Sequence, residues 1–174
     1  AVRLAWGLLP FWAKDPEGAR RPINARSETA FDKPTFRDGM RRRRCLVPAD
    51  GFYEWRRPPG GAGPKQPFWI HPADGGPMVM AGLWSRWRPK DGGDDVEAIE
   101  TFAILTTGPN AVLEPIHDRM PVILPESAWA AWLDPERGDD AEERAELAAL
   151  LRPAPDELLT AETVSRWVNS PAHD

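Results

Sequence analysis

Cysteine, histidine and long apolar runs are all scarce in this chain of 174 residues. The single cysteine, Cys45, excludes an intramolecular disulfide framework and fits a reducing compartment. No apolar run approaches the roughly 20 residues that a membrane-spanning helix needs, and the opening residues lack the layout of a secretory signal. We therefore expect a soluble, cytoplasmic protein with no membrane partner.

Metal-binding and nucleotide-binding motifs are also missing. There is no His-Glu-x-x-His, no Cys-x-x-Cys and no carboxylate cluster at ligand spacing, so we expect no metal. A phosphate loop of the nucleotide-binding kind does not occur either, and we expect no cofactor. Of the three histidines, His71 and His173 fit ordinary structural roles, which leaves His117 as the candidate for chemistry.

The composition is otherwise that of a folded domain. An apolar fraction of 41% and a charged fraction of 28% fit one domain over residues 1–174 with a real core. Twenty prolines and 14 glycines favour short strands and fixed loops over a helical bundle. We expect most of the nine tryptophans to anchor the core, and some to form a platform on which bases or sugars stack.

Charge is divided unevenly along the chain. The net charge is −5, yet residues 1–71 hold 14 Lys and Arg against 7 Asp and Glu. Such a basic half can present a local phosphate-binding face in an acidic protein. The run from Arg41 to Arg44 has two interpretations, a solvated patch before a strand or part of that face.

The periodicity of the sequence predicts an α+β fold with a mostly antiparallel, barrel-like or bifurcated sheet surrounded by short helices. We expect strands at residues 3–8, 43–47, 51–56, 66–71, 78–87, 100–107 and 163–168. We expect helices at residues 33–40, 125–133 and 139–151. The Asp74-Gly75-Gly76 turn predicts that 66–71 and 78–87 pair as a hairpin, while 58–64 and 91–95 are loops.

The tetrapeptide His117-Asp118-Arg119-Met120 is the most informative stretch. It places an imidazole, a carboxylate and a guanidinium between apolar flanks, where burial demands partners for charge. Imidazole titrates near neutrality and can donate or accept a proton. Asp118 either orients His117 or pairs with Arg119, and a structural hydrogen-bonding role for His117 is the alternative.

Two further segments carry candidate site residues. Glu54 follows Tyr53 and precedes Trp55, and a carboxyl group beside aromatic walls gains proton affinity and suits general acid/base work. The alternative is an exposed glutamate, or one paired with Arg56.

Asn24 and Arg26 alternate on one predicted strand, so both can face one cleft and hold a phosphate and a sugar oxygen. The alternative for Arg26 is a salt bridge with Glu28.

These motifs occur together in an order that resembles the SOS response-associated peptidase (SRAP) family, whose members process abasic sites. The resemblance covers nearly the whole chain and rests on six blocks: Trp-Gly-Leu-Leu-Pro at 6–10, Ile-Asn-Ala-Arg-Ser-Glu-Thr at 23–29, Arg-Arg-Cys-Leu-Val-Pro-Ala-Asp-Gly-Phe-Tyr-Glu-Trp at 43–55, Ala-Gly-Leu-Trp at 81–84, Leu-Thr-Thr at 105–107 and Ile-His-Asp-Arg-Met-Pro-Val at 116–122.

The resemblance implies a covalent reaction with single-stranded DNA. In the family, the initiator methionine is removed autocatalytically and the exposed cysteine forms a thiazolidine with the aldehyde of an abasic sugar. By resemblance, Glu54 assists sugar ring opening and crosslink reversal, and His117 assists Schiff-base formation or the elimination chemistry. Also by resemblance, Asn24 and Arg26 hold the abasic sugar and its flanking phosphate. Arg119 holds a further phosphate, and Thr106 lies near the lesion.

The family cysteine is not in the given sequence, because Ala1 falls inside what resembles the family's first tryptophan strand. We expect a domain that lacks its N-terminal segment, with the nucleophile, and its C-terminal end. Cys45 cannot replace the nucleophile, since its amine is in a peptide bond, and we expect a buried structural thiol.

We expect a monomer that acts on abasic single-stranded DNA. The alternatives are a non-catalytic nucleic-acid-binding module and a general cysteine-type peptidase.

Overall fold

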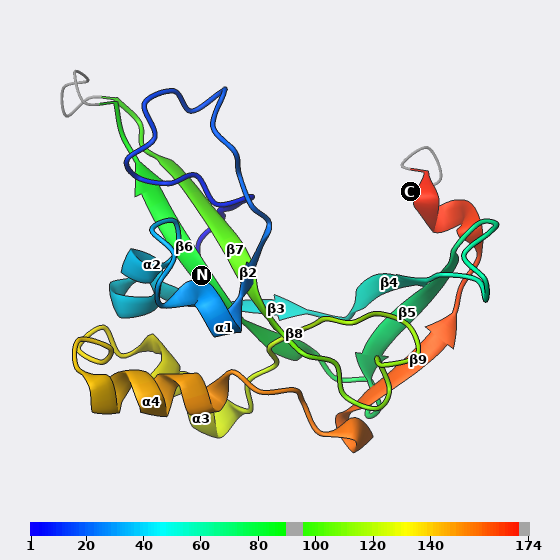
Figure 1. The fold of residues 1–174 in the computed structure, drawn as a ribbon. Helices are drawn as coiled ribbons and strands as arrows, with labels where there is room; N and C mark the ends of the chain where they lie inside the picture. The colour runs from blue at the N-terminus through cyan, green and yellow to red at the C-terminus, as the bar shows by residue number, and fades with distance from the viewer. Residues whose placement is uncertain (90–95, 171–174) are drawn as a thin grey trace.

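The computed structural model describes residues 1–89 and 96–170 and arranges their strands in two sheets (Figure 1). The larger sheet contains β1 (Ala5–Trp6), β2 (Asn24–Arg26), β3 (Arg44–Ala49), β6 (Met78–Trp87), β7 (Ile99–Thr107) and β8 (Met120–Pro121). The smaller sheet contains β4 (Phe52–Arg56), β5 (Gln66–Pro72) and β9 (Leu159–Thr163). Short helices surround them: α1 (Ser27–Ala30), α2 (Arg37–Arg42), α3 (Glu126–Leu133), α4 (Ala141–Leu150), and the 3₁₀ helices η1 (Asp156–Leu158) and η2 (Arg166–Asn169). The predicted α+β class with a mostly antiparallel, bifurcated sheet is confirmed.

The larger sheet forks beside β7. β6 pairs antiparallel with β7 as far as Gly82, opposite Ile104, and β8 then takes over the same edge opposite Thr106. The segment after β8 fills the fork, because the Ala81 N–H donates to the Val122 carbonyl and the Val122 N–H to Leu105. The residues just before β8 therefore lie where the sheet opens.

The opposite edge of β7 carries the two short parallel strands. β1 pairs with Thr101 and Phe102, and β2 pairs with Ile104 through Thr106. Asn24 to Arg26 and the segment that ends in β8 consequently flank the same end of β7 (Figure 1).

A crossing at Gly51 carries the chain from β3 into the smaller sheet. A Cβ atom there would lie 2.4 Å from the Ile70 carbonyl oxygen and 2.6 Å from the Trp69 ring. Contacts this short are incompatible with a side chain, so glycine lets the chain pass close to β5 just before it pairs with that strand as β4. This crossing brings β4 alongside the open end of the larger sheet.

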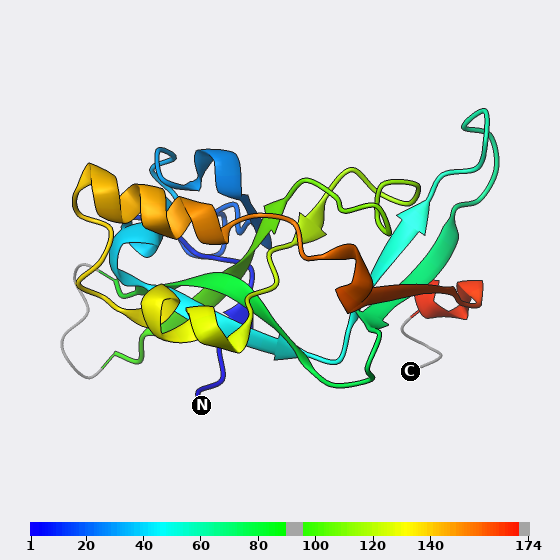
Figure 2. The same ribbon diagram turned by 90° about the horizontal axis from the view of Figure 1, so that it is seen from below.

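Two apolar clusters hold the layers together. The first lies between the larger sheet and its helices and includes Leu83, Leu105, Trp132 and Leu147. The second includes Ile70 and Leu159 of the smaller sheet, Met120 of β8 in the larger sheet, and Leu113 from the segment between β7 and β8. Figure 2 shows α3 and α4 along the larger sheet and the smaller sheet at the other end of the molecule.

The predicted hairpin of residues 66–71 and 78–87 is wrong. The Asp-Gly-Gly turn forms, since the Asp74 carboxylate accepts from the Gly76 N–H, but β5 pairs with β4 and β9 whereas β6 pairs with β3 and β7. Pro72 and Pro77 flank the turn and lack the N–H that would continue a ladder. The two strands therefore enter different sheets.

Other expectations need smaller corrections. The strand expected at 3–8 shortens to β1, the helix expected at 33–40 shifts to α2, the strand expected at 163–168 lies earlier as β9, and α1 was not predicted. Helices 125–133 and 139–151 and strand 100–107 are confirmed. The expected 91–95 loop lies outside the described residues.

The expectation that most tryptophans are core anchors is also wrong. Only Trp87 and Trp132 are buried, whereas Trp6, Trp12 and Trp167 are more than half exposed. Over residues 1–89 and 96–170, no helix has both the length and the apolar character to cross a membrane.

Candidate functional site

The six residues expected to form a site all line one cavity of about 770 Å³. Asn24 and Arg26 come from β2, Glu54 from β4, Thr106 from β7, and His117 and Arg119 from the segment before β8. The cavity lies where the two sheets meet, and four of its aromatic wall residues are Trp6, Phe52, Trp55 and Phe102. The sequence predicted that the polar residues share one site. It did not predict that Trp6 of β1 and Phe102 of β7 line the same cavity.

Asn24 and Arg26 alternate on β2 as expected, with both side chains exposed and Ala25 buried between them. The alternative salt bridge between Arg26 and Glu28 is wrong, because Glu28 binds Arg119 instead. Within the described part of the chain, the Arg26 guanidinium has neither a hydrogen bond nor an ion pair. It is a cation free to bind an anion at the cavity.

Glu54 and His117 form the acid/base pair of the cavity. Glu54 Oε2 lies 3.8 Å from His117 Nε2, and 23% of the Glu54 side chain is exposed. Burial raises the pKa of Glu54, and the nearby His117 charge only partly opposes that effect. The alternatives for Glu54 are wrong, since it is neither exposed nor paired with Arg56, whose guanidinium lies over the Phe68 ring.

The orientation of the His117 ring is set by its own loop. The backbone N–H of Arg119 donates to His117 Nδ1 at 3.1 Å. Nδ1 also lies 3.3 Å from the carbonyl oxygen of Arg119, so the tautomer of the ring decides whether Nδ1 accepts from the backbone N–H or donates to that oxygen. Nε2 is the nitrogen that faces Glu54. Asp118 lies beside the ring, with Oδ1 3.3 Å from Nδ1, and does not pair with Arg119.

Arg119 is held more firmly than the other cations of the cavity. Its Nη1 and Nη2 donate to the two carboxylate oxygens of Glu28 at 2.6 and 2.9 Å, and Nη2 also donates to the Thr106 carbonyl oxygen. Only 20% of the Arg119 side chain is exposed. Its charge is therefore largely compensated inside the protein.

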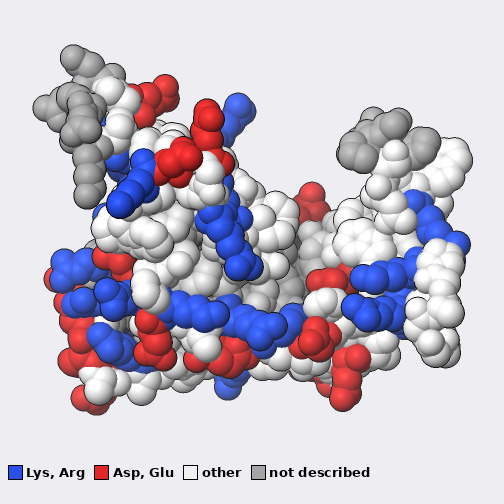
Figure 3. Space-filling model, turned by 45° about the horizontal axis from the view of Figure 1, so that its top comes forward, with Lys and Arg blue, Asp and Glu red and all other residues white. Residues whose placement is uncertain are grey.

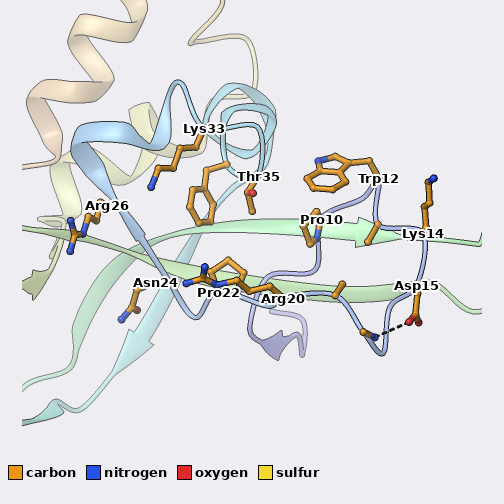
Figure 4. Close-up of a pocket in the computed structure, with 14 residues that line it drawn as sticks. Pro10, Trp12, Lys14, Asp15, Arg20, Pro22, Asn24, Arg26, Lys33 and Thr35 are labelled. Atoms are coloured by element: carbon orange, nitrogen blue, oxygen red, sulfur yellow. Dashed lines mark hydrogen bonds between the residues drawn. The ribbon is translucent and has the colours of Figure 1, made fainter.

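A second hollow of about 730 Å³ adjoins the first across β2. Asn24 and Arg26 line both, and Figure 4 shows Lys14, Arg20 and Lys33 around the second one. In the structure these cations lie outside the helices and strands, and no sequence pattern predicted that they meet. Their number favours an anionic ligand.

The arginines at residues 41–44 lie outside the cavity and make ion pairs and hydrogen bonds within the protein. Arg41 and Arg42 both bind Asp139, and Arg43 lies 3.2 Å from Asp38. Arg44 is buried and donates to backbone carbonyls. Figure 3 shows Lys and Arg side chains in a band across one face, with acidic side chains close to it in several places. Of the two interpretations of this run, neither describes Arg44.

Cys45 lies outside the cavity. It is half-buried, and burial raises the pKa of its thiol to about 12, so it carries almost no thiolate at neutral pH. In the described ranges, no group of three or more His, Cys, Asp or Glu residues is arranged to hold a metal ion.

Comparisons with known proteins agree with this architecture. The family model of SOS response associated peptidase (SRAP) matches residues 1–171. Abasic site processing protein YoqW of Bacillus subtilis (strain 168) is 40% identical over 174 residues, which span 99% of this chain and 72% of YoqW. Abasic site processing protein HMCES of Gallus gallus is 33% identical, over 98% of this chain and 54% of its own. A crystal structure of a protein from Bacteroides thetaiotaomicron superposes with a TM-score of 0.83 at 36% identity, over 97% of this chain and 72% of the other.

Proposed function

The chain belongs to the SOS response associated peptidase family, and we propose that it processes abasic sites in single-stranded DNA through a covalent adduct. The observation that carries the proposal is the single cavity that joins the Glu54–His117 pair to the unpaired Arg26 guanidinium. An acid/base pair next to a free cation suits a reaction on a sugar that is flanked by phosphates.

In the proposed reaction, the abasic sugar first opens. Glu54 donates a proton to the ring oxygen as the bond between that oxygen and C1′ breaks, and the C1′ hydroxyl proton passes to solvent, which leaves an aldehyde. In family members the attacking group is the cysteine that follows the initiator methionine, after that methionine has been removed autocatalytically. Its amine condenses with the aldehyde, and His117 Nε2–H assists the departure of water.

The cysteine thiol then adds to the carbon of the resulting C=N bond, and the thiol proton passes to nitrogen. The product is a thiazolidine that links protein and DNA. Reversal uses the same groups in the opposite direction, so Glu54 serves both directions.

DNA binding is divided between the two hollows. Asn24 and Arg26 hold the abasic sugar and its phosphate, because their side chains face both hollows from β2. Thr106 and Arg119 support the sugar from the other side of the cavity, and Arg119 contributes to a further phosphate with the part of its charge that Glu28 does not neutralise. Flanking phosphates lie along Lys14, Arg20 and Lys33.

Adduct formation tests the function directly. The protein translated from its own initiator methionine should retard an oligonucleotide with one abasic site on a denaturing gel, and the adduct should survive boiling. Cys45→Ala is the matched thiol control and should retain the full yield, because the raised pKa of that thiol keeps it protonated. Absence of an adduct with the unaltered protein would refute the proposal.

The same experiment separates the alternatives. Equal, salt-sensitive binding to intact and abasic oligonucleotides without an adduct would identify a non-catalytic nucleic-acid-binding module. Cleavage of an inert protein substrate would identify a general peptidase, whereas removal of only the protein's own methionine fits the proposed function.

Arg26→Ala should weaken binding of intact and abasic single strands alike. The loss of one phosphate contact should reduce the slope of log affinity against log salt by about 0.7. Titrations at several salt concentrations measure this slope, with Arg42→Ala as the control, since Arg42 binds Asp139 away from the cavity. An unchanged slope would remove Arg26 from the phosphate-binding set.

A further inference from the structure

Glu28 places a negative charge beside a cavity that we assign to an anionic ligand, where a carboxylate would repel a phosphate. It lies in α1, directly after β2, and its carboxylate binds both terminal nitrogens of Arg119. We propose that Glu28 is a positioning residue that fixes Arg119 and, through the Arg119 backbone, the ring of His117. This inference rests on the proposed function and assigns a further residue to the same site.

The connection from Glu28 to His117 consists of contacts at hydrogen-bond distance. The Arg119 guanidinium is fixed between Glu28 and the Thr106 carbonyl oxygen, which anchors residue 119 to both α1 and β7. The backbone N–H of the same residue donates to His117 Nδ1. The carbonyl oxygen of Arg119 lies 3.3 Å from the same nitrogen, so a shift of Arg119 moves both backbone groups that contact the His117 ring.

The pair also joins the two halves of the cavity. Asn24 and Arg26 precede Glu28 in the chain, and His117 precedes Arg119, so one ion pair links the phosphate-binding strand to the proton-transfer loop. The bidentate geometry gives this link a defined orientation. The Arg119 hydrogen bond lowers the pKa of Glu28, which favours the ionised carboxylate.

A second consequence concerns DNA affinity. While Glu28 neutralises Arg119, that cation adds little to the attraction for phosphate. Removal of the carboxylate releases a positive charge at the cavity while the His117 ring loses its fixed orientation. Catalytic rate and DNA affinity should therefore change in different directions, which a general loss of folding would not produce.

Two measurements on Glu28→Gln and Glu28→Ala test the proposal. The first is the single-turnover rate of adduct formation at saturating abasic oligonucleotide, together with the affinity for intact oligonucleotide. The second is the ¹⁵N spectrum of the His117 ring in the free protein, which distinguishes Nε2–H from Nδ1–H without DNA. Glu146→Gln is the matched control, because Glu146 binds Arg137 at 2.6 Å on α4, outside the cavity.

We expect rates about 10- to 100-fold lower, a tighter affinity for intact DNA, and a changed ratio of Nε2–H to Nδ1–H, with Glu146→Gln at wild-type values. Wild-type rates or a wild-type His117 spectrum in the Glu28 variants would overturn the proposal. If Glu28→Ala does not fold, the nearly isosteric Glu28→Gln variant tests the proposal alone. Failure of the proposed function would show separately, as absence of an adduct with the unaltered protein.

Discussion

Glu54→Gln should lower the rate of adduct formation on abasic single strands by about 10²- to 10⁴-fold, the range usual for loss of a general acid/base group. Glutamine keeps the shape of the side chain but has no proton to donate to the sugar ring oxygen. Single-turnover kinetics with the protein translated from its own initiator methionine measures the loss. The reversal rate of a preformed adduct should fall as well, because the same proton transfers run backwards.

The pH dependence of the reaction should identify Glu54 as the acid. Burial raises the pKa of Glu54, so its protonated form persists to a higher pH than that of an ordinary glutamate. If the protonated form donates to the ring oxygen, the rate of ring opening declines as the pH rises through this raised pKa. That alkaline limb should be absent in Glu54→Gln.

Glu54→Gln should raise the stability of the fold at neutral pH while it lowers the activity. Because folding raises the pKa of Glu54, the group's favourable contribution is complete below the pKa of the unfolded chain and is lost as the pH rises through the folded pKa. Above the pKa of the unfolded chain, Glu54 therefore lowers the free energy of unfolding. Glu54→Gln should have a higher melting temperature than the wild type at neutral pH, with a smaller difference in mild acid.

Glu162→Gln is the appropriate control for these measurements. Glu162 lies on β9 and also faces a histidine, with its Oε1 3.6 Å from His71 Nε2, yet it does not line the cavity. Its replacement should leave the rate and the alkaline limb unchanged. A Glu54→Gln protein with the wild-type rate would exclude Glu54 from the chemistry.

The local pattern of the sequence predicted two properties of the residues that line the cavity. Alternation on β2 placed Asn24 and Arg26 on one side, and the aromatic neighbours of Glu54 predicted its raised proton affinity. These properties depend on residues one or two positions away. Local periodicity determines the alternation on β2 before the fold is known, whereas the burial that raises the pKa of Glu54 also needs the other elements of the cavity.

Contacts between distant segments could not be predicted in the same way. The partner of Arg119 is Glu28, 91 residues earlier, and nothing local distinguishes it from Asp118 next to it. The pairing of β5 failed for the same reason, since the Asp-Gly-Gly turn is compatible with a hairpin and with a passage between sheets. Whether the chain forms a hairpin or passes between sheets depends on which strand edges are available for pairing in the folded protein.

The arginine run illustrates this limit most clearly. Four consecutive cations suggest one shared role, but Arg41 and Arg42 bind a surface aspartate while Arg44 enters the interior. The alternation of β3 points Arg44 inward, and two of its acceptors lie 88 and 90 residues further along the chain. The position in the strand predicts burial, but the acceptors that make burial possible come from another layer.

Arg44→Ala should destabilise the fold by about 1–3 kcal/mol for each buried carbonyl that loses its donor and gains no other. The guanidinium donates to backbone carbonyls at the C-terminal ends of α2 and α3, where helices leave their last carbonyls without partners. Its acceptors are the carbonyl oxygens of Trp132, Arg41, Met40 and Asp134. Burial lowers the pKa of Arg44, and nearby Asp134 and Glu143 offset part of that effect.

Denaturant unfolding of Arg44→Ala, Arg44→Lys and Arg42→Ala checks this assignment. Lysine keeps the charge but offers one ammonium where the planar guanidinium reaches several carbonyls, so it should recover only part of the loss. Arg42, with 63% of its side chain exposed, should contribute at most about 1 kcal/mol through its ion pair with Asp139. If Arg44→Ala lowers the free energy of unfolding no more than Arg42→Ala does, water must hydrogen-bond the carbonyl oxygens at the ends of α2 and α3 in place of Arg44. The buried arginine would then not be what joins α2 to α3 behind the cavity.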